Sequence, residues 1–221
     1  MTARRILVLG ASGGTGRHVV AMARHQGHDV TAFVRSAERM GDAAEGVKVI
    51  TGSVTDDGAA LEAAMRGQDV VISTLGVGNS LRSGGLIARS VPAILEAMEV
   101  QGIRRLVFTS AYGVGDTVRD VPLVPRLFMR TLLRDLYADK AAGEARLRRS
   151  DLDWTLVYPV TLTNGPATGR WRAGERLALS GFPKIPRADV ASFLLTQVDD
   201  RAYLRTGVLV SSGAAPHTPR T

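Results

Sequence analysis

Hydrophobic positions fall into short apolar runs that alternate with segments in which apolar residues recur every three or four positions. The apolar runs lie at residues 6–9, 29–34, 47–51, 70–75, 105–110, 153–158 and 207–211. The segments with helical spacing lie at residues 17–26, 57–66, 86–100, 126–149 and 188–198. A short apolar run is typical of a buried strand, and the longer spacing is typical of a helix with one face in the core. The pattern therefore predicts strands and helices in alternation.

This alternation determines the predicted fold class. Strands that alternate with helices form a parallel sheet, wound in the right-handed sense, with helices on both of its faces. We therefore predict an α/β protein with a doubly wound parallel sheet. Two stretches break the regularity. Residues 113–125 are expected to form a loop, and residues 160–187, which are rich in Gly, Pro and Thr, are expected to form further loops with short strands.

The length of the chain indicates its domain organisation. With 221 residues, it is long enough for one large core and short for two comfortable domains. We expect one domain over residues 1–212, including the two irregular stretches, and a loose tail over residues 213–221.

A glycine-rich turn follows the first apolar run, where Gly10, Gly13 and Gly16 punctuate Ile6-Leu-Val-Leu-Gly-Ala-Ser-Gly-Gly-Thr-Gly16. In a dinucleotide-binding turn, the first glycine permits a sharp bend, the second lets the backbone approach a pyrophosphate, and the third lets the helix pack on the strand. The helix then directs its free N–H groups and positive end at the phosphates. A turn of this kind also joins strands to helices where no ligand binds, but its place between the first strand and first helix favours a Rossmann-like nucleotide site.

The end of the second strand bears on the choice of cofactor. In dinucleotide-binding folds an acidic residue here accepts from the ribose 2′-hydroxyl of NAD, whereas an arginine pairs with the 2′-phosphate of NADP. Arg35 follows this strand and no acid is present, with Arg39 close behind. The alternative is an ordinary surface arginine. We interpret the pattern as a preference for NADP(H) over NAD(H).

Charge and composition remove several other classes. The net charge of +7 comes from basic residues spread along the chain, and the denser stretch at 126–149 also carries acids, which favours a solvated helix face over a nucleic-acid surface. The chain has no cysteine and only scattered histidines, at positions 18, 25, 28 and 217, so no metal site is expected. No apolar run approaches the length of a membrane span. The first residues lack a signal-peptide pattern, so a cytoplasmic protein is expected.

Several motifs, in this order and spacing, resemble one protein family. They are Gly10-Ala-Ser-Gly-Gly-Thr-Gly16, Val34-Arg35, Gly52-Ser-Val-Thr-Asp56, Thr109-Ser-Ala111 and Leu152-Asp-Trp-Thr-Leu-Val-Tyr-Pro159. Together they resemble the atypical short-chain dehydrogenase/reductases, and within these the NAD(P)H-binding proteins of the biliverdin reductase B (flavin reductase) and NmrA-like type. The resemblance extends to about residue 211.

The resemblance implies roles for particular residues. The glycine turn would line the pyrophosphate, Arg35 would bind the 2′-phosphate, and Ser110 would lie beside the nicotinamide. Ser53 would flank the adenine with Val54, although relatives usually have aspartate in place of Ser53. The cofactor-binding residues expected on this basis are Gly10, Ser12, Gly13, Gly14, Thr15, Gly16, Arg35, Ser53, Val54, Thr74, Leu75, Gly76, Ser110, Lys140, Tyr158 and Pro159. The catalytic candidates are Ser110, Tyr112 and Lys140.

One departure from the family concerns the acid that ordinary dehydrogenases of this kind use. These enzymes carry Tyr-x-x-x-Lys, whereas Tyr137 is one residue too close to Lys140 and Leu136 occupies the tyrosine position. Lys140 continues an otherwise apolar stripe, and burial of an unpaired ammonium is costly. We expect either a partner, which could be the cofactor ribose, Ser110 or Glu144, or a side chain that extends its charge into water.

These features predict an NADPH-dependent oxidoreductase that delivers hydride to a planar conjugated acceptor of the flavin, quinone or tetrapyrrole type. Such an acceptor needs little help from a strong acid, which suits the missing tyrosine. The alternative is a non-catalytic module that senses NADP(H) and acts through a protein partner, as the NmrA-like resemblance implies. A sugar-nucleotide epimerase or reductase is disfavoured by the short chain and the absent motif. We expect the protein to act on a small-molecule acceptor and to bind neither nucleic acid nor a membrane. We expect it to be a monomer or a small homo-oligomer.

Overall fold

A sheet of eight strands forms the centre of the computed structural model, which describes residues 2–78, 80–121, 126–127 and 131–213. The strand order is β3-β2-β1-β4-β5-β6-β10-β8. The bounds are β1 (Arg5–Leu9), β2 (Asp29–Val34), β3 (Lys48–Thr51), β4 (Val70–Ser73), β5 (Arg105–Thr109), β6 (Asp153–Pro159), β8 (Trp171–Gly174) and β10 (Thr206–Ser212). All neighbouring strands pair in parallel except β8, which runs antiparallel to β10. This arrangement confirms the predicted α/β fold class.

The order of the strands reverses at β1. The chain goes outward from β1 to β2 and β3 and then crosses back to β4, so β1 pairs with β2 on one side and with β4 on the other. The last residue of β1, Leu9, is in register with Phe33 of β2 and Ser73 of β4. In open sheets of this type, ligands bind outside the carboxyl ends of the strands at such a reversal.

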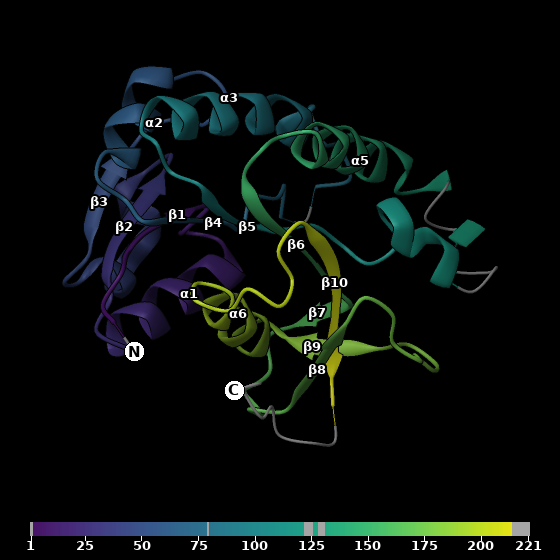
Figure 1. Ribbon diagram of the computed structural model, residues 1–221. Coiled ribbons are helices and arrows are strands. Elements are labelled where there is room, and N and C mark those ends of the chain that lie inside the picture. The colour runs from purple at the N-terminus through teal and green to yellow at the C-terminus, as the bar shows by residue number, and fades with distance from the viewer. Residues whose placement is uncertain (1, 79, 122–125, 128–130, 214–221) are drawn as a thin grey trace.

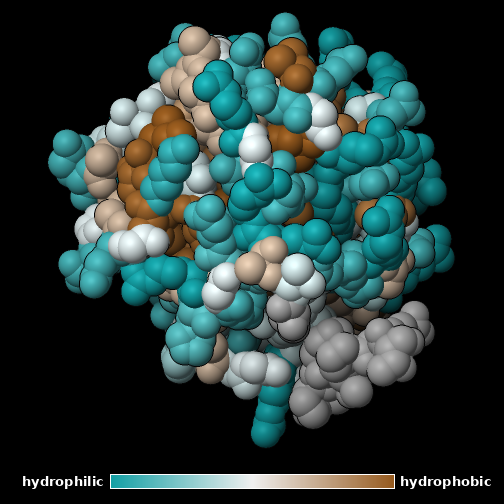
Figure 2. Space-filling model, turned by 60° about the vertical axis from the view of Figure 1, so that its left-hand side comes forward, coloured by the Kyte–Doolittle hydropathy of each residue, from teal (hydrophilic) through white to brown (hydrophobic). Residues whose placement is uncertain are grey.

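Helices cover both faces of the sheet (Figure 1). On one face α1 (Gly14–His25) packs against α6 (Arg187–Thr196), and on the other α3 (Leu86–Val100) packs against α2 (Gly58–Met65) and α5 (Arg134–Arg148). The first strand is fully buried from Ile6 to Leu9, as expected for a parallel sheet with both faces covered. Figure 2, which brings the β3 edge of the sheet forward, shows a surface that is mostly hydrophilic with separate hydrophobic patches. None of the described helices is long and apolar enough to cross a membrane.

Most predicted elements are present, and two match their predicted bounds: the strand at 29–34 and the helix at 86–100. The single helix predicted over 126–149 is wrong, because a turn at Leu132 and Leu133 precedes α5. The first helix begins at Gly14 rather than at residue 17, so the end of the glycine turn is already helical.

The two irregular stretches contain short elements. A 3₁₀ helix, η2 (Gly115–Asp120), lies in the predicted loop at 113–125, and another, η1 (Ala37–Ala44), follows β2. As predicted, residues 160–187 hold short strands: β8, and the parallel pair β7 (Thr161–Thr163) and β9 (Lys184–Pro186). Residues 122–125 of the predicted loop, Asn79, His217 and residues 214–221 of the predicted tail lie outside the described residues.

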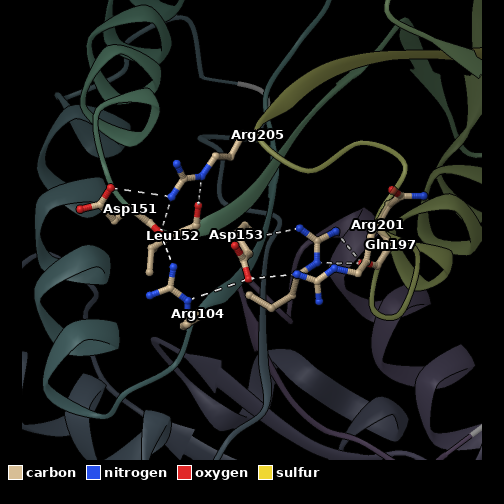
Figure 3. Close-up of polar contacts among 8 residues, drawn as sticks. Arg104, Asp151, Leu152, Asp153, Gln197, Arg201 and Arg205 are labelled. Carbon is tan, nitrogen blue, oxygen red and sulfur yellow. Dashed lines mark hydrogen bonds and ion pairs between the residues drawn. The ribbon is translucent and has the colours of Figure 1, made fainter.

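A cluster of arginines stabilises the edge of the sheet where the parallel strands begin. The carboxyl ends of these strands lie at the opposite edge. The Asp153 carboxylate, at the start of β6, forms ion pairs with Arg201 at 3.5 Å and Arg104 at 4.0 Å (Figure 3). Arg105 donates to the backbone carbonyls of Gln197 at 2.6 Å and Asp153 at 2.7 Å, and burial lowers the pKa of Arg105 to about 10. Some of the chain's arginine side chains therefore bind backbone carbonyls that lack partners at the ends of strands and helices.

Candidate functional site

A cleft of about 520 Å³ lies at the carboxyl edge of the sheet, at the strand reversal. Its walls come from the glycine turn after β1, the end of β2, the segment after β3 and the segment between β4 and α3. Of the predicted cofactor-binding residues, those that line this cleft are Gly10, Ser12, Gly13, Arg35, Ser53, Val54, Thr74, Leu75 and Gly76. The structure thus brings together residues from four separate segments of the sequence.

The glycines of the turn have different surroundings. Gly10 has a φ of +75°, in the left-handed region that favours glycine, and a Cβ there would lie 3.0 Å from the Thr74 carbonyl oxygen. A Cβ on Gly16 would lie only 2.2 Å from the Gly10 carbonyl oxygen. At Gly13 the corresponding contact is 3.1 Å, with no other atom within 4 Å. Gly10 and Gly16 are therefore required by the fold, whereas Gly13 borders open space in the cleft.

The start of α1 borders the cleft at Gly13. Gly13 is the N-cap residue, and no side chain caps the helix. The first N–H groups of a helix lack intrahelical partners and carry its positive end, so they favour an anion. Gly14, Thr15 and Gly16 form the first turn of α1 and do not line the cleft, and the Arg187 side chain covers Gly14.

Positive charge dominates the cleft. Arg35, Arg39, Arg82 and Arg89 line it, and Asp56 supplies the one carboxylate of its described lining, which Arg89 approaches to 3.6 Å. Within the described part of the chain, Arg35 has no hydrogen-bond or ion-pair partner, so its guanidinium remains available to an anion. Arg82 and Arg89 were not predicted to line the cleft, because they lie in a loop and on a helix rather than at a strand end.

Ser53 is held by a neighbouring carboxylate. Its hydroxyl donates to Asp56 Oδ2 at 2.6 Å and lies 3.1 Å from Thr55 Oγ1. The Ser53 hydrogen bond, followed by that of Thr55, lowers the pKa of Asp56. Asp56 therefore supplies an acid in this wall, three residues after the position where relatives usually carry aspartate.

Ser110 lies at the carboxyl end of β5, one strand beyond β4, and does not line the cleft. Its hydroxyl donates to Glu144 of α5. The other Glu144 oxygen, Oε2, accepts from the Tyr158 hydroxyl at 2.7 Å, and Arg148 donates to the Tyr158 oxygen at 3.0 Å. Burial raises the pKa of Glu144, while Ser110, Tyr158 and the nearby cations Arg148 and Lys140 oppose that rise.

Tyr158 borders a different cavity from the one expected. It lines a second cavity of about 320 Å³, together with residues of η2, the end of α5 and the start of β10. Its hydroxyl is held by Glu144 and Arg148 rather than facing the large cleft. Pro159 is buried at the end of β6, where its carbonyl accepts from the backbone N–H of Tyr112 at 3.1 Å.

Lys140 of α5 is partly buried, and none of the described residues hydrogen-bonds or ion-pairs with its ammonium. Burial lowers its pKa, and the carboxylates of Glu144 and Asp139 oppose that shift. Of the partners expected for Lys140, Ser110 and Glu144 bind each other. The cofactor ribose and water are the expected partners that remain.

The two tyrosines near this edge both donate to backbone carbonyls. The Tyr112 hydroxyl donates to the Asp120 carbonyl at 2.6 Å, and the Tyr137 hydroxyl donates to the Tyr112 carbonyl at 3.1 Å. Burial raises the pKa of both phenols. Leu136, at the position where the family motif has tyrosine, offers no proton. Neither described phenol is therefore free to act as an acid in the geometry observed.

Comparisons with known proteins agree with this arrangement. Residues 10–201 match the family model described as NAD(P)H-binding. Among curated proteins, the chain is 26% identical over 217 residues to the uncharacterized sugar epimerase YhfK of Bacillus subtilis, covering 96% of each chain. Among solved structures, ChuY of Escherichia coli O157:H7, described as an anaerobillin reductase, superposes with a TM-score of 0.78 at 24% identity, covering 97% of this chain and 100% of ChuY. A wide-type short-chain dehydrogenase/reductase from Veillonella parvula in complex with NADP gives 0.79 at 21%, covering 98% of each. These two structural likenesses show the shared fold.

Proposed function

The chain belongs to the NAD(P)H-binding family, and we propose that it is an NADPH-dependent reductase that transfers hydride to a planar conjugated acceptor such as a flavin, quinone or tetrapyrrole. The cleft at the strand reversal carries this proposal, because the uncapped start of α1 borders it at Gly13 and arginines outnumber carboxylates along its described lining. The cofactor supplies the hydride chemistry, and the protein supplies orientation and exclusion of water.

The preference for NADPH rests on the end of β2. Arg35 is exposed, lines the cleft and lacks a partner among the described residues, and Arg39 lies on the same wall. A guanidinium binds a phosphate through charge-assisted hydrogen bonds, which are stronger than those between neutral groups. Among the residues that the structure describes, the wall at the end of β2 contains no carboxylate that would favour a ribose 2′-hydroxyl.

The acceptor class rests on the tyrosine hydroxyls. A carbonyl reductase must protonate a developing alkoxide, and a positioned acid accelerates such a step by about 10²- to 10⁴-fold. Tyr112 and Tyr137 instead donate to backbone carbonyls. A flavin or quinone spreads the incoming charge over its conjugated system, so it accepts hydride without a strong acid. This argument also disfavours a sugar epimerase, the activity in the name of the Bacillus subtilis relative.

Steady-state oxidation of NADPH tests the proposal. The acceptors are FMN, a benzoquinone, a linear tetrapyrrole, an aldehyde and a nucleotide sugar, with NADH compared against the best acceptor. We expect turnover with a conjugated acceptor, weaker activity on the aldehyde, and a higher kcat/KM for NADPH than for NADH. A faster reaction with the aldehyde would favour a carbonyl reductase. Tight NADPH binding without turnover on any acceptor would favour the NADP(H)-sensing module.

A further inference from the structure

A continuous chain of hydrogen bonds joins the carboxyl edge of β5 to the second cavity on the α5 face of the sheet. We propose that Ser110, Glu144 and Tyr158 form an internal path that carries a proton from this cavity to the reduced acceptor. The inference rests on the proposed function, because it assigns the source of the proton that accompanies the hydride.

The three residues come from three elements and are shielded from water. Ser110 ends β5, Glu144 lies on α5 and Tyr158 lies on β6, and their exposed fractions are 5%, 2% and 1%. Glu144 contacts both neighbours at once, since one carboxyl oxygen binds the Ser110 hydroxyl and the other binds the Tyr158 hydroxyl at 2.7 Å. Each link therefore joins two oxygen atoms that can exchange a proton along the hydrogen bond.

The second cavity supplies the outer end of the path. Tyr158 and Arg148 line it together with Asp116, which forms an ion pair with Arg148 at 3.3 Å. Its volume of about 320 Å³ and polar lining suit water, which needs polar partners. Arg148 donates to the Tyr158 oxygen, so the phenol proton is directed toward Glu144.

Two glycines make the close approach of these side chains possible. A Cβ on Gly115 of η2 would lie 2.6 Å from Glu144 Oε2 and 3.2 Å from the Tyr158 hydroxyl oxygen. A Cβ on Gly207 of β10 would lie 2.7 Å from the Tyr158 ring. The backbone thus leaves room for the buried glutamate and tyrosine, at positions where any other residue would collide with them.

The inner end of the path lies next to the cleft. Ser110 follows β5, which is the neighbour of β4, and the segment after β4 lines the cleft through Thr74, Leu75 and Gly76. Adjacent strands are about 4.8 Å apart, so Ser110 is about one strand spacing from that wall. A hydroxyl at this distance is suitably placed to contact a nicotinamide or an acceptor stacked on it.

Burial of Glu144 shifts its ionisation toward the protonated form. Burial raises the pKa of Glu144, whereas Lys140 and Arg148 on the same helix, together with the hydroxyls of Ser110 on β5 and Tyr158 on β6, oppose that rise. A carboxyl group with a raised pKa binds a proton more readily than an exposed glutamate does, and it can lend that proton and recover it.

The acceptor gains one hydride and one proton in the proposed transfer. The acceptor takes hydride from NADPH and becomes an anion, and the anionic oxygen or nitrogen takes the Ser110 hydroxyl proton. The hydrogen bond between Ser110 and Glu144 then reverses, and Ser110 recovers a proton from the protonated Glu144 carboxyl. Glu144 takes the Tyr158 hydroxyl proton, and Tyr158 takes a proton from water in the second cavity, which leaves hydroxide that exchanges with bulk water. The products are NADP⁺ and the acceptor reduced by one hydride and one proton.

Glu144→Gln and Tyr158→Phe interrupt the path while nearly conserving side-chain volume. The matched controls are Glu99→Gln, on the exposed side of α3, and Tyr203→Phe, whose hydroxyl contacts the Ala173 carbonyl at 3.4 Å. We expect kcat with a quinone to fall about tenfold in Glu144→Gln, which is less than the roughly 10²- to 10⁴-fold that a positioned acid supplies, because a conjugated acceptor spreads the incoming charge. In the wild type, kcat should fall as rising pH ionises Glu144, and this fall should be absent in Glu144→Gln. The solvent deuterium isotope effect on kcat should change in both path variants and in neither control.

Infrared difference spectroscopy provides a readout that needs no acceptor. As the pH is lowered, the wild-type protein should show a buried carboxylic-acid band before its exposed carboxylates become protonated. Glu144→Gln should remove this band, Tyr158→Phe should shift it, and both controls should retain it. Absence of this band in the wild type would overturn the path even if turnover is observed. Turnover with unchanged pH profiles and isotope effects in both path variants would also overturn it, while leaving the reductase intact. If the band is present but no acceptor is turned over, the proposed reductase function would be wrong, and Glu144 would be a buried group that binds a proton without passing it to an acceptor.

Discussion

Asp139 of α5 accepts a hydrogen bond from the backbone N–H of Ile87, in the first turn of α3, at 3.0 Å. Its second carboxyl oxygen accepts from the next N–H, that of Ala88, at 2.8 Å. An acid at a helix N-terminus binds free N–H groups and complements the positive end of the helix. Because the segment before α3 forms one wall of the cleft, Asp139 links the packing of α5 to the position of that wall.

Asp139→Ala should leave these two N–H groups without a side-chain acceptor. We expect the free energy of unfolding to fall by about 2 kcal/mol or more, since a buried unsatisfied polar group costs about 1–3 kcal/mol. Urea unfolding measures this loss, with Glu99→Ala at the exposed end of α3 as the control. NADPH affinity should also fall, because the loop before α3 loses its anchor. Equal stabilities for the two variants would contradict the anchoring role of Asp139.

Arg35→Ala tests the choice of cofactor. Loss of a charge-assisted contact to the 2′-phosphate removes about 1.5–3 kcal/mol, which corresponds to about one to two orders of magnitude in the Kd for NADPH. The Kd for NADH should remain nearly unchanged, because NADH lacks that phosphate. Fluorescence titration with both cofactors measures the difference, and Arg146→Ala, exposed on α5, is the matched loss of charge. Equal weakening of NADPH and NADH would mean that Arg35 supports the fold or the shared pyrophosphate.

Gly13→Val and Gly16→Ala should separate binding from folding. Valine at position 13 projects into the space beside the turn, so it should abolish binding of both cofactors with little change in the melting temperature of the apo protein. Alanine at position 16 would bring its Cβ within 2.2 Å of the Gly10 carbonyl oxygen, so it should lower the melting temperature. Calorimetry and cofactor titration of both variants check this contrast. Cofactor binding by Gly13→Val would show that the pyrophosphate does not approach this turn.

The sequence predicted features that depend on local order. The strand at 29–34 and the helix at 86–100 have continuous patterns and match the structure, and the order strand, glycine turn, helix predicted the turn at Gly10 to Gly16. The break before α5 was missed, because helical spacing continues through Leu132 and Leu133 without Gly or Pro. Local spacing indicates which face of a segment is apolar, but it does not indicate where a helix ends and the next one begins.

The parts of the site that were missed depend on contacts between distant segments. Glu144 was expected only as a partner for Lys140, whereas the packing of α5 over β5 and β6 places it between Ser110 and Tyr158. Similarly, Asp139 binds α3 at a separation of 52 residues. Neither the crossing of two helices nor the antiparallel addition of β8 leaves a periodic signal in one sequence.

Tyr112→Phe tests whether this phenol replaces the missing acid. The hydroxyl donates to the Asp120 carbonyl, so its removal should lower the free energy of unfolding by about 0.5–1.5 kcal/mol and leave kcat on conjugated acceptors nearly unchanged. Paired measurements of urea unfolding and of NADPH oxidation with a quinone check this. Loss of turnover in the variant, together with better activity of the wild type on aldehydes, would make the protein an ordinary carbonyl reductase.

Glu144→Gln should change how stability depends on pH. Burial raises the pKa of Glu144 in the folded protein above its ordinary value of 4.5, so the unfolded chain releases this proton at a lower pH than the folded chain does. Between the two pKa values the folded state binds the extra proton, and the free energy of unfolding therefore falls as pH rises, by about 1.4 kcal/mol per pH unit at most. Below 4.5 the contribution is fully present, and above the raised pKa it is lost. Glutamine does not titrate, so the difference in the free energy of unfolding between wild type and variant should decline across this window and then become constant. The lowered pKa values of Asp56, Asp69 and Asp135 affect both proteins equally, so their contributions cancel in this difference. A difference that stays constant from pH 4 to pH 8 would mean that Glu144 ionises alike in both states, and a carboxylate of that kind could not hold the proton that the path requires.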